Sequence, residues 1–376
     1  MRLFPSLLAL ALSLLLTACA SLRDDASYVL QAAGGHLALM QAARPVAQWL
    51  ADDSASPALK NRLQLTQRMR QFAVTELALP DNPSYQRYAD LNRRAVVWNV
   101  VAAPPLSLTL KTWCFVVTGC IGYRGYFDEA QARAQAQVLQ AQGLEVRVYG
   151  VPAYSTLGWL NWAGGDPLLN TFINYPEGEL AGLIFHELAH QQLYVPDDTM
   201  FNESFATAVE QLGARRWLST QAPPEAQLAF EGRERRRQQF RALCLATRTR
   251  LAAIYQQQPS ASADKPDLLA LKALAMQDFR SDYQRLKAQW GGNSGYDDWV
   301  AQANNAAFGA QAAYDEWVPG FEALFAREGQ DWPRFYQAVQ ALAQKPPLER
   351  RQLLNALNAL GTLNTLNHAK KGAVRG

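Results

Sequence analysis

The segment His186-Glu187-Leu188-Ala189-His190 carries the residues whose types and spacing indicate chemistry. It is an H-E-x-x-H pattern within apolar residues that are spaced as in a helix. Histidines four residues apart lie on one helix face, about one turn apart, so both imidazoles can bind one metal ion. Neutral imidazoles suit zinc, which polarises carbonyls and lowers the pKa of bound water to roughly 7. Glu187 would lie beside the ion and act as general base.

Glu203 is the predicted third ligand. It opens a second helical pattern, which follows a turn at Pro196-Asp197-Asp198. An antiparallel second helix would bring the Glu203 carboxylate back to the histidines and leave a fourth position open, as in catalytic zinc sites. We therefore expect one Zn²⁺ per chain. Alternatively, Glu203 is an ordinary first-turn residue favoured by the helix dipole. Glu210, further along the same face, could support the ligands from behind.

The elements that must position these residues predict an α+β fold that is predominantly α-helical. A small mixed sheet is expected next to the zinc-binding helix pair, and a helical C-terminal region closes one wall of the cleft. Helical patterns cover 26–79 with a break near 52–57, 127–142, 179–218 with a turn at 195–199, and most of the chain from there to about 361. Runs typical of strands cover 95–101, 106–117 and 145–151.

The N-terminus resembles a bacterial lipoprotein signal. Arg2 is followed by the apolar run 3–16 and by Leu16-Thr17-Ala18-Cys19. The resemblance implies cleavage before Cys19 and a lipid on that cysteine. Ala20 follows where an Asp would resemble the inner-membrane retention signal, so the resemblance favours attachment to the outer membrane, facing the periplasm. The alternative is an uncleaved membrane helix, but the run is shorter than the roughly 20 residues that span a bilayer.

Two cysteines are close enough in sequence to pair. In an exported protein, Cys114 and Cys120 are expected to form a disulfide, and Cys244 to be a buried thiol. A metal site on the first two is the alternative, but nothing nearby supplies further ligands. The net charge of only +3 argues against nucleic acid as a partner.

The sequence H-E-L-A-H followed by N-E-S-F-A resembles the glutamate-zincin peptidases, in which an H-E-x-x-H helix and a downstream Asn-Glu helix hold zinc. Aminopeptidase N has a similar N-E-G-F-A. The chain is also similar over most of its length to bacterial lipoproteins labelled predicted aminopeptidases, through the lipoprotein signal, residues 122–127 and 153–159, and the metal motif. The resemblance implies peptide hydrolysis, with a peptide as substrate.

The predicted regions are a signal peptide (1–18), an N-terminal helical region (19–94), a zincin-like catalytic region (95–220), a helical C-terminal region (221–363) and a flexible tail (364–376). An aminopeptidase is the expected function. An endopeptidase acting on envelope proteins, or a non-catalytic zinc-binding envelope lipoprotein, is the alternative. Glu187 argues against the last of these, because a purely structural site needs no base.

The resemblance also suggests residues that contact the substrate. In glutamate-zincins, an edge strand before the metal helix pairs with the bound peptide. The corresponding residues here are Tyr154, Ser155, Thr156, Leu157 and Gly158. An aromatic-rich loop packed on the core is the alternative for them. Tyr314 could donate a hydrogen bond to the oxyanion, and Asp166 or Glu179 could hold a substrate amine.

Overall fold

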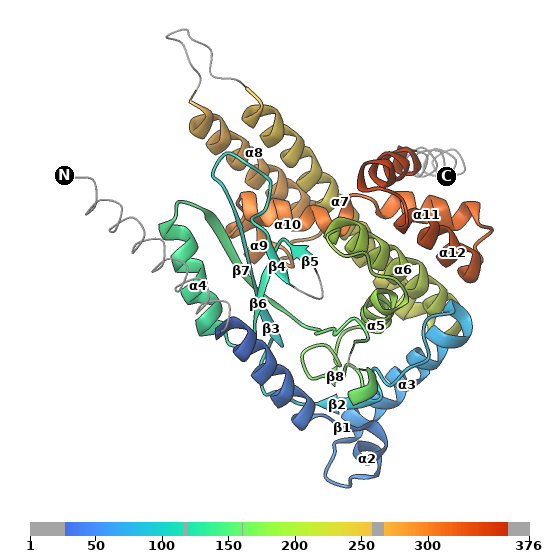
Figure 1. Ribbon diagram of the computed structural model, residues 1–376. Coiled ribbons are helices and arrows are strands. Elements are labelled where there is room, and N and C mark those ends of the chain that lie inside the picture. Colours follow the sequence, from blue (N-terminus) through green and yellow to red (C-terminus); the bar gives the residue numbers. More distant parts are fainter. Residues whose placement is uncertain (1–26, 116–118, 160, 258–266, 360–376) are drawn as a thin grey trace, which may run out of the picture.

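The fold is α+β and predominantly helical, as the sequence predicts (Figure 1). The computed structural model describes residues 27–115, 119–159, 161–257 and 267–359, apart from the side chains of 313–315. The predicted signal peptide, Cys19 and the whole predicted tail lie outside these residues. In Figure 1, strands and α4 lie to one side of the helix pair α5 and α6, and α11 and α12 to the other.

The N-terminal region consists of a helix over 27–42, α2 (Val46–Ala51) and α3 (Pro57–Leu77). Ser56 caps α3 by accepting a hydrogen bond from the Leu59 N–H, so α3 begins just after the predicted break. The short strands β1 (Arg44–Pro45), β2 (Arg87–Ala89) and β8 (Leu168–Leu169) form a mixed sheet. In it, β2 pairs antiparallel with β1 and parallel with β8.

A second, antiparallel sheet has the order β6-β3-β7. Its strands are β6 (Arg124–Tyr126), β3 (Val97–Ala103) and β7 (Glu145–Val151), and α4 (Glu129–Ala141) covers one face. Side chains alternate between the faces of a strand. Accordingly, Trp98 and Val100 pack towards α4, whereas Val101 packs with Ala306 on the opposite face. Both faces of β3 are therefore buried.

Of residues 106–115, the described part of the predicted strand 106–117, only β4 (Trp113–Phe115) is a strand. The chain before it runs against α10 (Asn305–Asp315). A Cβ on Gly309 would lie 2.8 Å from both the Leu108 carbonyl oxygen and a Leu110 methyl group. The apolar residues that predict a strand here are thus used for contact with a helix, not for pairing in a sheet.

The predicted disulfide between Cys114 and Cys120 is present and joins β4 to β5 (Gly119–Ile121). These strands form a separate two-stranded sheet. The Cys120 N–H donates to an oxygen of Asp197 at 2.6 Å, which attaches this hairpin to the turn between the metal-motif helices. Cys244 is buried, as predicted.

The metal-motif helices are α5 (Glu177–Gln192) and α6 (Thr199–Gln221), which pack on each other and on α3. The remaining helices are α7 (Pro224–Tyr255), α8 (Leu268–Gln289), α9 (Asp297–Ala301), α10, α11 (Val318–Arg327), α12 (Trp332–Ala343) and a helix over 347–359.

The main core extends from Leu39 to Leu357 and takes side chains from all three predicted helical and catalytic regions. Phe185 of α5, for example, stacks on Phe72 of α3, with the ring centroids 6.1 Å apart. The regions predicted from the sequence therefore share one core, and their boundaries stay a prediction. Among the described residues, no helix is long and apolar enough to cross a membrane.

Candidate metal centre

The turn between α5 and α6 fixes how the two helices return on each other. Asp198 caps α6 by accepting from the Phe201 N–H. The Asn202 amide bonds both the N–H and the carbonyl of Val195 at 2.8 and 2.7 Å, which closes the turn. Arg350, from the helix over 347–359, donates two hydrogen bonds to Asp198 at 3.0 and 2.7 Å, and both side chains are buried. This turn makes α6 antiparallel to α5.

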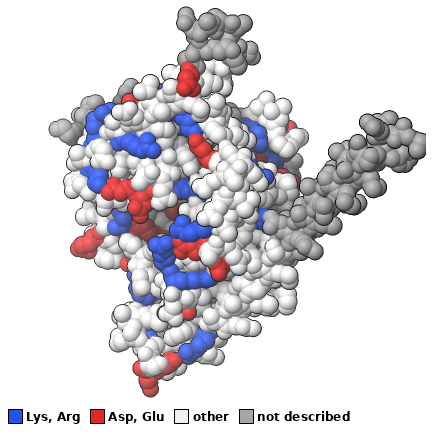
Figure 2. Space-filling model, turned by 90° about the vertical axis from the view of Figure 1, so that its left-hand side faces the viewer, with Lys and Arg blue, Asp and Glu red and all other residues white. Residues whose placement is uncertain are grey.

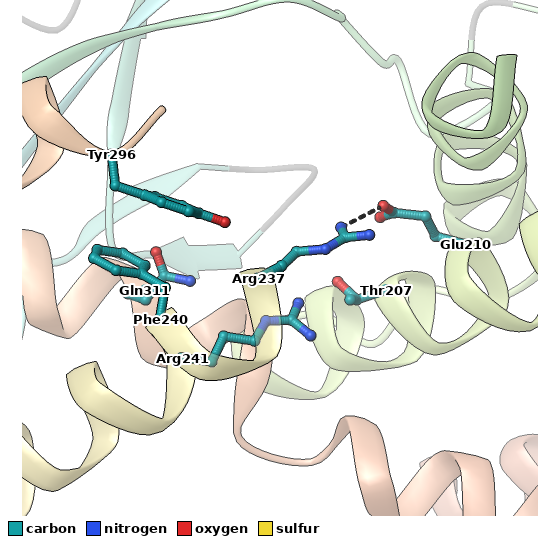
Figure 3. A pocket seen from close by; sticks show the side chains of 7 residues that line it. All are labelled: Thr207, Glu210, Arg237, Phe240, Arg241, Tyr296 and Gln311. Atoms are coloured by element: carbon teal, nitrogen blue, oxygen red, sulfur yellow. Dashed lines mark hydrogen bonds and ion pairs between the residues drawn. The ribbon is translucent and has the colours of Figure 1, made fainter. Parts of the chain in front are cut away.

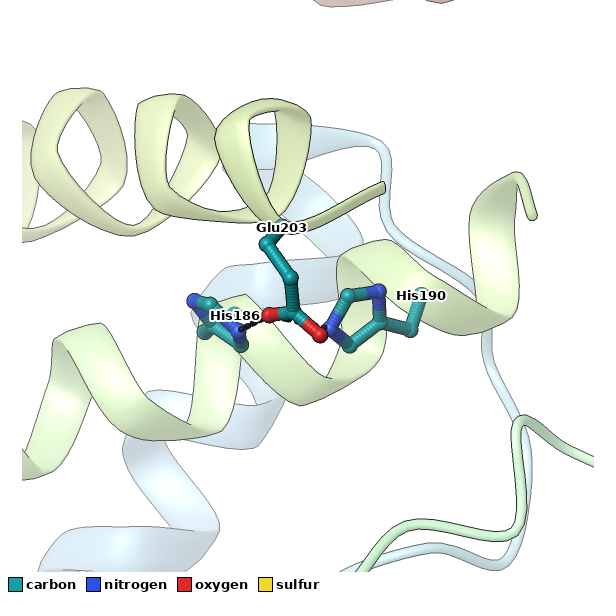
Figure 4. A group of neighbouring side chains, drawn as sticks. All are labelled: His186, His190 and Glu203. Atoms are coloured by element: carbon teal, nitrogen blue, oxygen red, sulfur yellow. Dashed lines mark ion pairs between the residues drawn. The ribbon is translucent and has the colours of Figure 1, made fainter. Parts of the chain in front are cut away.

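The antiparallel pair brings His186, His190 and Glu203 together (Figure 4). The His186 Nε2 and His190 Nε2 atoms lie 3.4 and 3.5 Å from the same Glu203 oxygen. Potential ligand atoms of the three residues all lie within 4.8 Å of one another, and each residue is at least 92% buried. Two imidazole nitrogens and a carboxylate converging on one point form a donor set that suits zinc. The residues therefore fit the predicted ion.

Electrostatics of the cluster favour an ionised Glu203. Burial alone would raise the pKa of this carboxyl group, but the charge of His190 and the hydrogen bonds with His186 and His190 lower it to about 2. A carboxylate that stays ionised when buried is a suitable metal ligand, because it needs no deprotonation before the ion binds.

Glu210 supports His186 from the side away from Glu203. Its carboxylate lies 3.1 Å from His186 Nδ1, and Arg237 of α7 donates to its other oxygen at 3.1 Å. Arg237 also bonds Glu234 at 2.6 Å. When a protonated Nδ1 donates a hydrogen bond to Glu210, the lone pair that can bind metal is on Nε2. We call the chain Arg237–Glu210–His186 the relay, and it selects the ligating tautomer. Burial would raise the pKa of Glu210, but His186 and Arg237 lower it to about 2.

Glu187 lies on the same turn as His186, with a different electrostatic balance. Burial, together with the charge of Glu203, raises the pKa of Glu187 above 4.5, although the nearby histidines oppose the shift. The nearby Ser155 hydroxyl also opposes the rise of the Glu187 pKa. A carboxylate with a raised pKa is better matched to accepting a proton near neutral pH.

Residues 153–156 form no strand, and 157–159 form a turn in which Leu157 has a positive φ of 54°. The segment is held by Asp166, which accepts from the Thr156 N–H at 3.0 Å and from Ser155 at 3.4 Å. Asp166 also accepts from Gln191, beside His190, at 3.2 Å. The segment therefore lies next to the metal helix, and its contact with substrate stays a prediction.

The two carboxylates suggested for binding an amine have other partners in the structure. Asp166 is 1% exposed, and burial raises its pKa to about 6. Glu179 forms an ion pair with Arg233 of α7. These contacts hold the protein together around the site, and a role of either residue in binding a substrate amine stays a prediction.

Two tyrosines near the metal cluster were not predicted from the sequence. Burial and the charges of Glu203 and Glu187 raise the pKa of Tyr123 well above 10. Burial and the charge of Glu203 raise the pKa of Tyr194 to about 12. The sequence feature that could have indicated Tyr123 is its position in the segment 122–127, Gly-Tyr-Arg-Gly-Tyr-Phe, which contributes to the family resemblance. The side chain of Tyr314, the predicted oxyanion donor, lies outside the described residues.

A cavity of about 220 Å³ adjoins the site behind Glu210 (Figure 3). Glu210 and Thr207 form part of its wall on α6, and Thr207 is one helical turn beyond Glu203. The other lining residues are Arg237, Phe240, Arg241, Tyr296 and Gln311. Figure 3 shows Arg237 pointing towards Glu210. The cavity thus begins beside the face of α6 that carries Glu203.

Comparison with curated proteins and comparison with solved structures find no match for this chain. A family model described as "Putative aminopeptidase" matches residues 27–354, which include the helix pair, the three sheets described above and the C-terminal helices as far as Leu354. Most of the chain is covered. The protein therefore belongs to the family described as "Putative aminopeptidase".

Proposed function

We propose that the protein is a zinc-dependent aminopeptidase of the bacterial cell envelope. The observation that carries the proposal is the buried cluster of His186, His190 and Glu203, with Glu187 beside it. Membership of the family supports a peptidase. The cluster supplies three metal ligands, which is the number in catalytic zinc sites, where water or substrate takes the fourth coordination position.

The chain's own residues divide the work of hydrolysis. His186, His190 and Glu203 would hold the zinc, which when bound supplies a Lewis acid that polarises the scissile carbonyl and makes water more acidic. Glu187 removes a proton from the attacking water and passes it to the leaving amine. Tyr123 is the proposed hydrogen-bond donor to the oxygen that becomes negative, because its phenol lies near enough to Glu203 and Glu187 for their charges to raise its pKa.

The first experiment measures zinc per chain by mass spectrometry on protein that starts after Cys19, for the wild type and His190→Ala. We expect about one zinc in the wild type and none in the variant. A folded wild type that contains no zinc, even after reconstitution, contradicts the proposal and favours a non-catalytic envelope lipoprotein.

Peptides with free and blocked N-termini then distinguish the two peptidase classes. An aminopeptidase cleaves only the free peptides, whereas cleavage of the blocked ones identifies an endopeptidase. Glu187→Gln is the matched control, because it retains all three metal ligands and removes the base. Equal activity in this variant would contradict the assigned role of Glu187.

We also propose that a lipid on Cys19 anchors the protein to the outer membrane, facing the periplasm. The support is the sequence Leu16-Thr17-Ala18-Cys19 after an apolar run. Labelled fatty acid should be incorporated into the wild type and not into Cys19→Ser. Labelling of both, or of neither, contradicts the anchor.

A further inference from the structure

One side of the molecule presents two adjacent segments that contain no Asp, Glu, Lys or Arg, namely 27–43 and 152–165. Across the whole chain, 18% of residues are of these types. Figure 2 shows one side of the molecule, on which charged side chains gather into patches with white areas between them. We call the exposed residues of the two segments the uncharged face.

The two segments lie against each other. The His36 and Tyr154 rings are 5.8 Å apart. A Cβ on Gly164 would lie 3.9 Å from the terminal methyl of Met40. The turn 157–159 and the short helix over 161–163 are therefore next to the helix over 27–42. Burial lowers the pKa of His36, so it adds no charge near neutral pH.

The uncharged face also exposes large apolar side chains. Trp162 and Trp159 are 85% and 64% exposed, and Leu30 and Leu37 of the helix are 72% and 58% exposed. The solvent side of this helix is completed by small or uncharged residues, including Ala33, Gly34, Ala38 and Gln41. A surface helix of a soluble protein normally carries charged or polar residues on that side. Apolar exposure of this kind marks an interaction site.

We infer that the uncharged face lies on the surface of a lipid bilayer. Tryptophans are favoured at the boundary between membrane and water, and a helix with an apolar face can lie in that boundary. The position of the face in the chain supports a bilayer over a protein partner. Seven residues separate Cys19 from Ser27, and they span at most about 25 Å when extended. A lipid on Cys19 would therefore hold the helix close to the membrane.

This surface contact would also orient the metal site. The segment 152–165 contains Ser155 and Thr156, which bond Asp166, and Asp166 bonds Gln191 of the metal helix. A bilayer against Trp159 and Trp162 would thus be a fixed distance from the site. The inference does not require the proposed peptidase activity.

The first test uses protein starting after Cys19 and vesicles of phosphatidylethanolamine and phosphatidylglycerol. We expect the protein to float with the vesicles. The pair Leu30→Gln and Leu37→Gln should lower the partition coefficient about tenfold or more, because each leucine loses its burial in the bilayer. The matched control, Leu228→Gln with Leu348→Gln, removes leucines that are 68% and 71% exposed elsewhere and should leave partition unchanged.

The second test uses the full chain, purified from membranes and placed in vesicles with brominated acyl chains, which quench tryptophan. We expect quenching in the wild type that is largely lost in Trp159→Ser with Trp162→Ser. Equal quenching in the two proteins, or no vesicle binding without the lipid anchor, overturns the inference. So does a lipid-free dimer that Leu30→Gln with Leu37→Gln dissociates, because the face is then an interface between two copies.

Discussion

Replacing Glu210 tests whether the relay behind His186 contributes to metal binding. In Glu210→Gln, an amide oxygen can still accept from Nδ1, but the negative charge that makes the imidazole a stronger ligand is lost. In Glu210→Ala, the buried Nδ1 loses its acceptor as well. Arg237 also pairs with Glu234 at 2.6 Å, so neither variant should leave its guanidinium without a carboxylate.

The magnitude follows from this geometry. Loss of a group that supports a metal ligand lowers metal affinity by about 10- to 100-fold. We expect about tenfold for Glu210→Gln and about 100-fold for Glu210→Ala, which correspond to about 1.4 and 2.7 kcal/mol. Competition with a zinc chelator of known affinity measures both values.

Glu322→Gln is the matched control, because it removes a carboxylate from an exposed ion pair with Arg215 of α6. Its zinc affinity should equal that of the wild type. Thermal unfolding of the metal-free variants shows whether each of them folds. If folded Glu210→Ala binds zinc as tightly as Glu322→Gln, the relay has no part in binding the metal.

Three further predictions follow from the contacts around the site. Tyr123→Phe should lower kcat at least tenfold with unchanged zinc content, because the oxyanion loses a donor; an unchanged kcat refutes that role. Asp198→Ala should lower the free energy of unfolding by about 3–5 kcal/mol, because Arg350 stays buried without its partner; denaturant unfolding measures this loss. Burial raises the pKa of Asp166 to about 6 from 3.8, so its folded form retains a proton that the unfolded chain loses. Stability of the metal-free protein should therefore fall from pH 4 to 6 relative to Asp166→Asn, and parallel curves would contradict this.

The sequence predicts the metal cluster because its geometry is local. Four-residue spacing places the histidines on one helix face. The turn between α5 and α6 is short, so α6 must run back alongside α5. Glu203 is then within reach. The turn also has its own signals, since Asp198 and Asn202 are residue types that cap helices and close turns. The disulfide is predictable for the same reason, as its cysteines are close in sequence.

Contacts made by tertiary packing could not be predicted in this way. Arg237 reaches Glu210 from α7, and its position depends on how that helix crosses α6. The strand expected over 106–117 fails for a related reason. Alternating apolar residues fit a sheet or a helix surface equally well, and in this protein Leu108 and Leu110 pack beside Gly309 of α10. Periodicity shows that a segment is buried without showing its partner.

The supports of the metal cluster come from widely separated parts of the chain. Asp197 accepts a hydrogen bond from the Cys120 N–H of the β4–β5 hairpin, and Asp198 accepts from Arg350. Gln191 donates to Asp166. These contacts hold the end of α5 and the start of α6 without using any of the three ligands. A site braced in this way resembles a preorganised one, in which the ligands are placed before the ion arrives. Zinc would then stabilise an existing arrangement, in contrast to small zinc domains that fold only when the metal binds.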